Sequence, residues 1–156
     1  MIFIYGSIAL IFLALDRCTK YWALIHCTDY TSFNRFFSCS LCFNKGIAGG
    51  ILHSENSLLA LAITLSIALI LILACFYTLF EWYKNNVYLF GELLVISGAV
   101  SNLYDRIMYP GVIDFIIIHF RNFYFPAFNI ADIGIIIGIG IVFYKSCYDT
   151  THAQKA

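Results

Sequence analysis

SLLALAITLSIALILILACFYTLF, residues Ser57 to Phe80, decides the fold class, because this apolar run contains no charged residue. A helix needs about 20 mostly apolar residues to cross the hydrocarbon core of a bilayer. The rest of the chain agrees: 62% of its 156 residues are hydrophobic and 12% are charged, whereas about a quarter of the residues in a soluble domain are charged. We therefore expect an integral membrane protein. Its formal net charge of zero gives no reason to expect nucleic acid as a partner.

Three further runs are apolar enough to form membrane helices. The first is not typical of a signal peptide, because no basic residue precedes Asp16 and no small-residue cleavage site follows the run. The third run ends at Pro110-Gly111, a pair that stops helices. The expected fold class is a membrane all-α protein, with one domain over residues 1–156. Its four transmembrane helices are predicted at residues 1–25, 57–80, 87–109 and 127–144.

The two longer connections, residues 26–56 and 110–126, predict short strands rather than helices. The first carries aromatic and polar residues without a helical period, which favours extended strands at the membrane surface. In the second, Val112–Ile118 is typical of a strand and Arg121-Asn122 of a turn. A small sheet outside the membrane is therefore expected.

The six cysteines do not predict a metal site. Cys39 and Cys42 have a suggestive spacing, but no second pair of cysteines or histidines accompanies them, and zinc needs four such ligands. A disulfide among the cysteines of the first connection is possible if this segment faces an oxidising compartment.

The unusual polar residues gather at one side of the predicted membrane domain. With four helices, the end of the first, the end of the third and the start of the fourth lie together, and ionisable residues inside a membrane are expensive. Glu92 is the one charge within a predicted helix that falls elsewhere. The gathered residues are Asp16, Lys20, Asn44, Asn102, Asp105, Arg106, Asp114, Asn129 and Asp132.

Several spacings within this set have a structural and a functional interpretation. Asp16 and Lys20 are four residues apart, so on a helix they can form either a structural ion pair or part of a site. Gly98, Asn102 and Arg106 form a polar stripe that could simply hold helices together. Gly134 and Gly138 are a pair of small residues typical of close helix packing.

Asp114 and Asp132 differ from these, because neither has a cation at helical spacing. Two such carboxylates near one membrane surface could bind an ion, relay protons or form a catalytic pair. A small transporter, a non-catalytic subunit of a membrane complex and an enzyme therefore stay open on the residues alone. Paired halves and broken helices, which are common in transporters, are not visible in the sequence.

Five motifs in this region resemble those of signal peptidase II, the bacterial lipoprotein signal peptidase. The resemblance extends over the whole chain in length, in the number of predicted helices and in the order of the motifs. They are Asp16-Arg17-Cys18-Thr19-Lys20 (D-x-x-T-K), Asn44-Lys45-Gly46-Ile47-Ala48 (N-x-G-x-A), Gly98 with Asn102-Leu103-Tyr104-Asp105-Arg106 (G-x-x-x-N-x-x-D-R), Val112-Ile113-Asp114-Phe115 (V-x-D-F) and Phe128-Asn129-Ile130-Ala131-Asp132 (F-N-x-A-D).

The chain departs from the family pattern beside these motifs. Arg17 stands where the family usually has Gln, and Gly49 where it usually has Phe. Ser97 and Ser101 replace glycines that are common in the third motif. These departures concern the packing near the substrate, since every acid, amide and base of the motifs is kept.

The resemblance implies an aspartic endopeptidase with Asp114 and Asp132 as its catalytic dyad. It would remove signal peptides from bacterial prolipoproteins, cutting before a cysteine that carries diacylglycerol. Two close carboxylates share one proton. The ionised one can activate a water, while the protonated one hydrogen-bonds the carbonyl oxygen of the peptide bond. No metal, cofactor or covalent intermediate is needed. By the same resemblance, the residues that bind the substrate or support the dyad would be Asp16, Lys20, Asn44, Gly46, Asn102, Arg106 and Asn129.

The resemblance also implies the location and the partners. The protein would be a monomer in the bacterial inner (cytoplasmic) membrane, in contact with membrane lipid and with diacylglyceryl-modified prolipoproteins. The active site, a small β-cradle and a surface flap around Arg121 would face the periplasm, and both termini the cytoplasm. The positive-inside rule gives no help, because the basic residues divide equally between the sides: Arg35, Lys45 and Arg121 against Lys84, Lys145 and Lys155.

Overall fold

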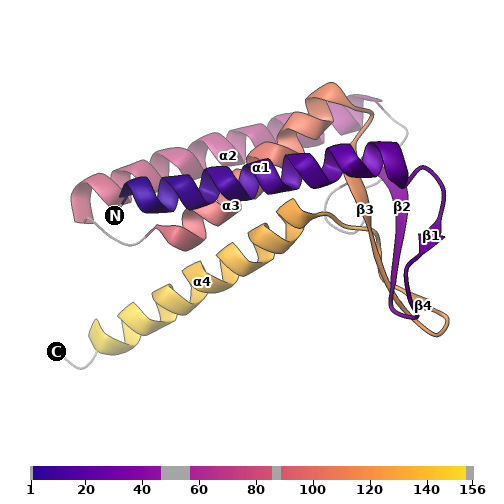
Figure 1. The fold of residues 1–156 in the computed structure, drawn as a ribbon. Coiled ribbons are helices and arrows are strands. Elements are labelled where there is room, and N and C mark those ends of the chain that lie inside the picture. Colours follow the sequence, from indigo (N-terminus) through magenta and orange to yellow (C-terminus); the bar gives the residue numbers. More distant parts are fainter. Residues whose placement is uncertain (1, 47–56, 86–88, 154–156) are drawn as a thin grey trace.

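The computed structural model describes residues 2–46, 57–85 and 89–153, which form four long helices and a small sheet (Figure 1). The sheet lies at one end of the helices, and α1 begins and α4 ends at the opposite end (Figure 1). The elements in chain order are α1 (Ile2–His26), β1 (Thr31–Ser32), β2 (Phe37–Asn44), α2 (Ser57–Asn85), α3 (Phe90–Met108), β3 (Val112–Phe120), β4 (Phe123–Tyr124) and α4 (Ile130–Ala153).

The four predicted helices are present, with shifted ends. α2 continues past the predicted residue 80 to Asn85, and α4 starts at Ile130 and runs on to Ala153. α3 ends at Met108, because Tyr109 is extended (φ −132°, ψ 167°), the conformation that a following proline favours. The predicted start of this helix at residue 87 lies outside the described residues.

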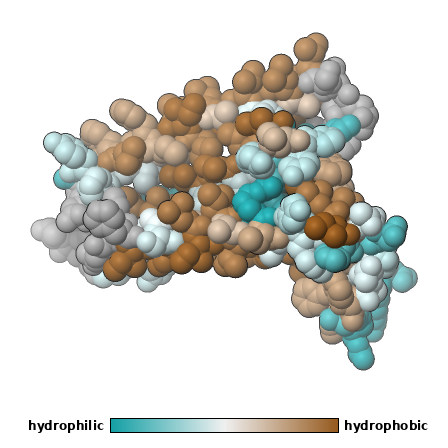
Figure 2. Space-filling model, turned by 45° about the horizontal axis from the view of Figure 1, so that its top comes forward, coloured by the Kyte–Doolittle hydropathy of each residue, from teal (hydrophilic) through white to brown (hydrophobic). Residues whose placement is uncertain are grey.

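Two of the described helical stretches are long and apolar enough to cross a membrane: Leu58–Lys84 and Ile130–Tyr148. Their side chains are mostly not buried inside the protein, which fits a lipid environment better than a soluble core. α1 and α3 are interrupted by charges near the sheet, Asp16 and Lys20 in one and Asp105 and Arg106 in the other. Figure 2 shows apolar residues over much of the helical surface and hydrophilic residues on and near the sheet.

The sheet has four antiparallel strands in the order β1-β2-β3-β4. The strand and the turn predicted in the second connection are confirmed as β3 and the turn at Arg121-Asn122, and the short strand β4 follows this turn. Arg121 has a φ of 54°, the left-handed conformation of a tight turn. The β2–β3 register is interrupted between Cys39 and Cys42.

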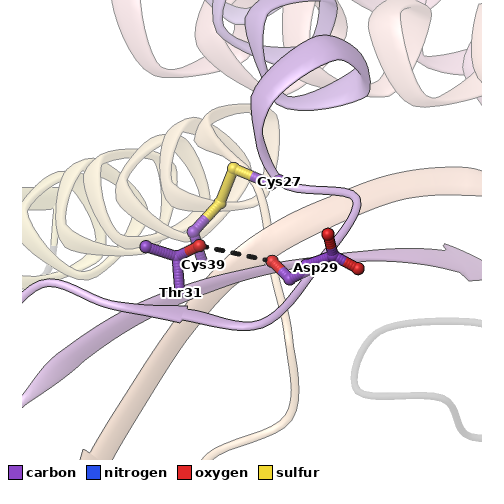
Figure 3. Close-up of a disulfide and its surroundings, with 4 residues drawn as sticks. All are labelled: Cys27, Asp29, Thr31 and Cys39. Atoms are coloured by element: carbon purple, nitrogen blue, oxygen red, sulfur yellow. Dashed lines mark hydrogen bonds between the residues drawn. A yellow bond between two sulfur atoms is a disulfide. The ribbon is translucent and has the colours of Figure 1, made fainter.

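A disulfide joins the end of α1 to the sheet. Cys27 and Cys39 are bonded, and the hydroxyl of Thr31 donates to the backbone carbonyl of Asp29 beside them (Figure 3). Both cysteines belong to a small buried cluster that also contains Ala23, Ile113 and Phe115. The disulfide left open by the sequence is therefore assigned to this pair, while Cys42 carries a free, exposed thiol.

α3 occupies the centre of the fold, with contacts to each of the other helices and to β3. It meets α4 closely at Gly138, where a Cβ atom would lie 2.6 Å from the carbonyl oxygen of Gly91. The packing interpretation of this glycine is thereby confirmed. Near the same end, Glu92 forms an ion pair with Lys145 at 3.3 Å, which gives the isolated charge of the third helix a partner.

Candidate active site

The predicted polar cluster assembles where the helices meet the sheet. Its members come from both the helices and the sheet. Hydrogen bonds link residues far apart in the sequence, as from Asn44 to Asp114 and from Asn102 to Asp132. α1 contributes Asp16 and Lys20, α3 contributes Asn102 and Arg106, β2 Asn44, β3 Asp114, and the start of α4 Asn129 and Asp132.

Asp114 is held on β3 by two amides. The residue is 2% exposed. The side-chain nitrogen of Asn44 donates to Oδ2 at 3.0 Å, and that of Asn129 donates to Oδ1 at 2.7 Å. Asn44 is on β2, the strand paired with β3, so sheet pairing brings this donor to the carboxylate.

Asp132 is fixed by the way α4 begins. Asn129 precedes the helix, and its Oδ1 accepts from the backbone N–H of Asp132 at 2.9 Å, while the N–H of Asn129 donates back to Oδ2 of Asp132 at 3.3 Å. This reciprocal pair is a capping box, which the spacing Asn-x-x-Asp favours. The side chain of Asn102 donates to the other oxygen, Oδ1, at 2.8 Å. The same residues that start the helix therefore orient its carboxylate.

Gly98 allows α3 to approach this helix start. A Cβ atom at position 98 would lie 2.7 Å from the carbonyl oxygen of Ala131. Any side chain there would push the first turn of α4, and with it Asp132, away from Asn102. Gly98, which the sequence spacing placed in a polar stripe, is therefore needed for the close backbone contact between α3 and the start of α4.

Lys20 lies behind the two aspartates in a fully buried ionic cluster. Its Nζ is 2.9 Å from Oδ2 of Asp16 and 2.8 Å from Oδ2 of Asp105. It also donates to Oδ1 of Asn102 at 2.7 Å. Because a lysine only donates, it must meet the oxygen of the Asn102 amide, which turns the NH₂ group toward Asp132. The cluster thus sets the orientation of the Asn102 amide, which donates to Asp132.

Asp16 connects the cluster to α4 and α3. Its Oδ1 accepts from the backbone N–H of Ala131 at 2.6 Å, and its Oδ2 accepts from the Ser101 hydroxyl at 2.5 Å. The Asp16–Lys20 pair predicted from the spacing is present and fully buried.

Arg106 contacts the backbone after β2. It donates to the carbonyl oxygens of Lys45, at 3.4 Å, and Gly46. The backbone N–H of Gly46 in turn donates to Oδ1 of Asn44 at 2.9 Å. Arg106 therefore holds the segment that carries Asn44. Ile47 and Ala48 of the second motif, together with Gly49, lie outside the described residues.

Burial and charge act together on Asp114. Removal from water raises the pKa of its carboxyl from 3.8 to about 7, and the nearby Asp132 contributes in the same direction. The hydrogen bonds from Asn44 and Asn129 and the charge of Lys20 oppose this rise. A carboxyl of this pKa can hold or release a proton near neutral pH.

Sequence reasoning left Asp105, Arg17 and Ser101 out of the site. Oδ2 of Asp105 accepts from the backbone N–H of Ile113 at 3.2 Å, and Arg17 and Ser101 contact the ionic cluster. The signal was available for Asp105, which belongs to the third motif and to the predicted polar side.

The chemistry available here is that of two acids held by amides. Within the described ranges, no three His, Cys, Asp or Glu side chains form a group that could hold a metal ion. The amides of Asn44, Asn102 and Asn129 fix the carboxylates without titrating themselves. The arrangement suits proton transfer and activation of a water molecule.

Comparison with known proteins gives a consistent result. The sequence profile described as "Signal peptidase (SPase) II" matches residues 8–148. The lipoprotein signal peptidase of Clostridium novyi is 36% identical over 143 residues, covering 88% of this chain and 89% of the relative. That of Buchnera aphidicola is 35% identical over 154 residues, covering 94% and 96%.

Solved structures agree on the fold. A bacterial membrane enzyme determined by the in meso method at 2.3 Å resolution superposes with a TM-score of 0.78 at 25% identity, covering 97% of this chain and 92% of the other. A second one, at 1.9 Å resolution, gives 0.72 at 25% identity, with 93% of each chain covered. The chain therefore belongs to the signal peptidase II family of aspartic-type peptidases, membrane enzymes that remove signal peptides from prolipoproteins.

Proposed function

We propose that this chain cuts prolipoproteins before the diacylglyceryl-modified cysteine, with Asp114 and Asp132 as the catalytic dyad. The observation that carries the proposal is the position of Asn129. Its side chain donates to Asp114 and its backbone N–H donates to Asp132, so one residue holds both acids. Two acids fixed to one bridging residue are suited to act on the same bond.

The mechanism follows from the proton that the two acids share. Like charges in a buried site cannot both form easily, so one member is ionised and the other protonated. The ionised member removes a proton from water, whose oxygen attacks the scissile carbonyl carbon. The protonated member hydrogen-bonds the carbonyl oxygen, and a proton then passes to the leaving amine as the C–N bond breaks. The dyad ends the cycle with one proton again.

The surrounding residues have supporting roles in this proposal. Asn44, Asn102 and Asn129 orient the carboxylates, because each donates to one of them. Asp16 and Lys20 hold Asn102 and the first turn of α4 from behind. Gly46 and Arg106 hold the segment after β2, which would border the bound peptide.

We also propose that all four helices span the inner membrane and that the sheet lies on its periplasmic side. Both termini would then lie in the cytoplasm. The outer surfaces of α2 and α4 support this arrangement, because many of their exposed side chains are large and apolar: Leu65, Ile72, Phe76, Ile136 and Phe143. Four of the charges of α1 and α3 that oppose insertion, those of Asp16, Arg17, Lys20 and Asp105, are paired with one another at the sheet end.

The sheet supplies a surface for the lipid-bearing substrate. β2 and β3 extend away from the helices (Figure 1), and Asp114 lies near the start of β3. Exposed aromatic residues stand at the far ends of these strands and in the adjoining segments: Phe37 of β2, Phe120 of β3, Phe36 before β2 and Phe123 of β4. In this proposal β1 and β2 form the cradle, the turn at Arg121 forms the flap, and the monomer is the working unit.

A cleavage assay tests the proposal. Purified protein in detergent is incubated with a prolipoprotein that carries diacylglycerol on its cysteine and with the same prolipoprotein unmodified. We expect cleavage of the modified substrate only, with mass spectrometry placing the new N-terminus at the modified cysteine. Asp132→Asn serves as the inactive control. Equal cleavage of both substrates, or a cut elsewhere, would overturn the proposed specificity.

A further inference from the structure

Arg17 closes the ionic cluster from the outside. Its Nη1 donates to Oδ1 of Asp105, and it lies 3.3 Å from the hydroxyl and 3.4 Å from the carbonyl oxygen of Ser101. The guanidinium carbon is 4.6 Å from the centre of the Tyr104 ring, and the side chain is 25% exposed. Arg17 therefore reaches the cluster from its solvent- or lipid-facing edge and does not reach the dyad itself.

The cluster is electrically balanced only when Arg17 is included. Asp16 and Asp105 are two buried acids, and Lys20 is one buried base. The ammonium group of Lys20 has three N–H donors, and they meet Asp16, Asp105 and Asn102. Oδ1 of Asp105 is the oxygen that Arg17 takes. A buried carboxylate without its cation is strongly unfavourable.

Asp105 is linked to each aspartate of the proposed dyad through one or two intervening groups. Its Oδ2 accepts from the backbone N–H of Ile113, the residue before Asp114. It also shares Lys20 with Asn102, which donates to Asp132. A displacement of Asp105 therefore reaches each aspartate by a short route of hydrogen bonds.

We infer that Arg17 is a positioning residue for cleavage, which acts through Asp105 and Lys20 to keep the cluster neutral and both aspartates in place. If the positive charge of Arg17 were removed, Asp105 would draw Lys20 away from Asn102. One uncompensated negative charge would then stand behind the dyad. This inference rests on the proposed dyad.

The loss of this charge has a definite sign. The charged and titratable groups around the dyad are Asp16 and Lys20 from α1, Asp105 and Arg106 from α3, Cys42 from β2, and the two aspartates themselves. An added negative charge among them makes ionisation of the dyad harder. Both limbs of the kcat–pH profile should move to higher pH, by roughly 0.5–1 unit for a charge about 10 Å away at an effective dielectric constant near 20–40.

The experiment measures kcat and KM against pH for Arg17→Gln, which keeps an N–H donor but removes the charge. We expect the upward shift, with kcat lowered about threefold to tenfold on the acid limb of the profile and KM changed less than about twofold, because in this inference Arg17 acts through Asp105 and Lys20. Arg17→Lys keeps the charge, so its kcat–pH profile should coincide with that of the wild type. Lys84→Gln, which removes an exposed cation at the far end of α2, is the matched control and should also leave the profile unmoved.

A second variant distinguishes the effect of the lost charge from the effect of the changed side-chain shape at position 17. Arg17→Gln combined with Asp105→Asn restores a neutral cluster, and its profile should return toward that of the wild type. A profile of Arg17→Gln that superimposes on the wild type, or a double variant shifted as far as Arg17→Gln, would overturn the inference. If Arg17→Gln does not fold, Asp105→Asn alone gives the cluster a positive charge and must shift the profile to lower pH.

Asp114→Asn and Asp132→Asn in the same assay distinguish a failure of the proposed dyad from a failure of the Arg17 inference. If both are inactive while the Arg17→Gln profile does not move, the dyad stands and this inference fails. If either retains wild-type cleavage, the proposed dyad itself fails.

Discussion

The side-chain amide of Asn129 donates to Oδ1 of Asp114 across 2.7 Å, and so ties the start of α4 to the middle of β3. Asn129 is fully buried and also caps the helix that carries Asp132. Its hydrogen bonds therefore join secondary structure and site geometry in one residue. Changes at this position should affect the rate of cleavage more than the stability of the fold.

Asn129→Ser tests this relationship. Serine caps a helix nearly as well as asparagine, so the contribution of the cap to the free energy of unfolding should fall by no more than about 1 kcal/mol. Serine is too short to reach Asp114, so kcat should fall about 100-fold, the scale of one lost orienting contact in a catalytic site. Steady-state cleavage and thermal unfolding in detergent measure the two effects. A variant with kcat within about threefold of wild type would show that the bridge is not needed.

Lys20→Met tests the buried ionic cluster. It leaves Asp16 and Asp105 without their shared cation, so the free energy of unfolding should fall by about 3–5 kcal/mol. Lys145→Met is the matched control, because its pair with Glu92 is partly exposed and the expected loss is about 1 kcal/mol or less. Chemical unfolding in detergent compares the two. Equal losses would contradict the special role of the cluster at the sheet end.

The raised pKa of Asp114 predicts how stability depends on pH. Folding raises this pKa from 3.8 to about 7, so between these values the folded protein binds more protons than the unfolded chain. Its stability should therefore fall as pH rises through this window. Asp114→Asn removes the effect, so its midpoint of thermal unfolding should exceed that of the wild type at pH 8 and approach it at pH 4. A difference that stays constant over this range would contradict the assignment.

The same pKa predicts the high-pH limb of activity. In the proposed mechanism one of the two acids must be protonated, so kcat should decline as pH rises past about 7. The measurement is kcat from pH 5 to 9 with saturating substrate. A rate that stays level to pH 9 would be inconsistent with a shared proton on Asp114.

Removal of the Cys27–Cys39 disulfide should loosen the junction of α1 and the sheet. The bond closes a loop with a sequence separation of 12, and a loop of this size contributes about 2–4 kcal/mol. Cys27→Ser with Cys39→Ser should show this loss, and a reducing agent should bring the wild type to the same stability. Cys18→Ser, at an exposed free cysteine, should change nothing. Insensitivity of the wild type to reduction would contradict the role of the bond.

Local patterns predicted most of the fold. The apolar run after Ser57 became α2, and the β-branched run after Val112 became β3. These features depend on a few neighbouring residues, so the sequence carries them directly. The pairing of Cys27 with Cys39 and the register change before Cys42 depend on how two distant segments meet, and no local pattern encodes them.

The site shows the same division. The polar residues could be gathered on one side from the number of helices alone, because alternate helix ends must lie together. The bridge made by Asn129 and the charge that Arg17 adds to Asp105 could not be inferred in this way. They depend on side-chain reach between elements that are more than a dozen residues apart.

The central claim is that Asp114 and Asp132 act together on one peptide bond, and single-turnover cleavage by Asp114→Asn and Asp132→Asn tests it most directly. Each variant keeps the size of the side chain, so circular dichroism and thermal unfolding can verify that the fold is retained. We predict that each slows cleavage of a diacylglyceryl-modified prolipoprotein by at least about 1,000-fold and that the double variant is scarcely slower, because the two acids form one unit. A folded variant of either kind that cleaves within about tenfold of the wild-type rate would contradict the dyad.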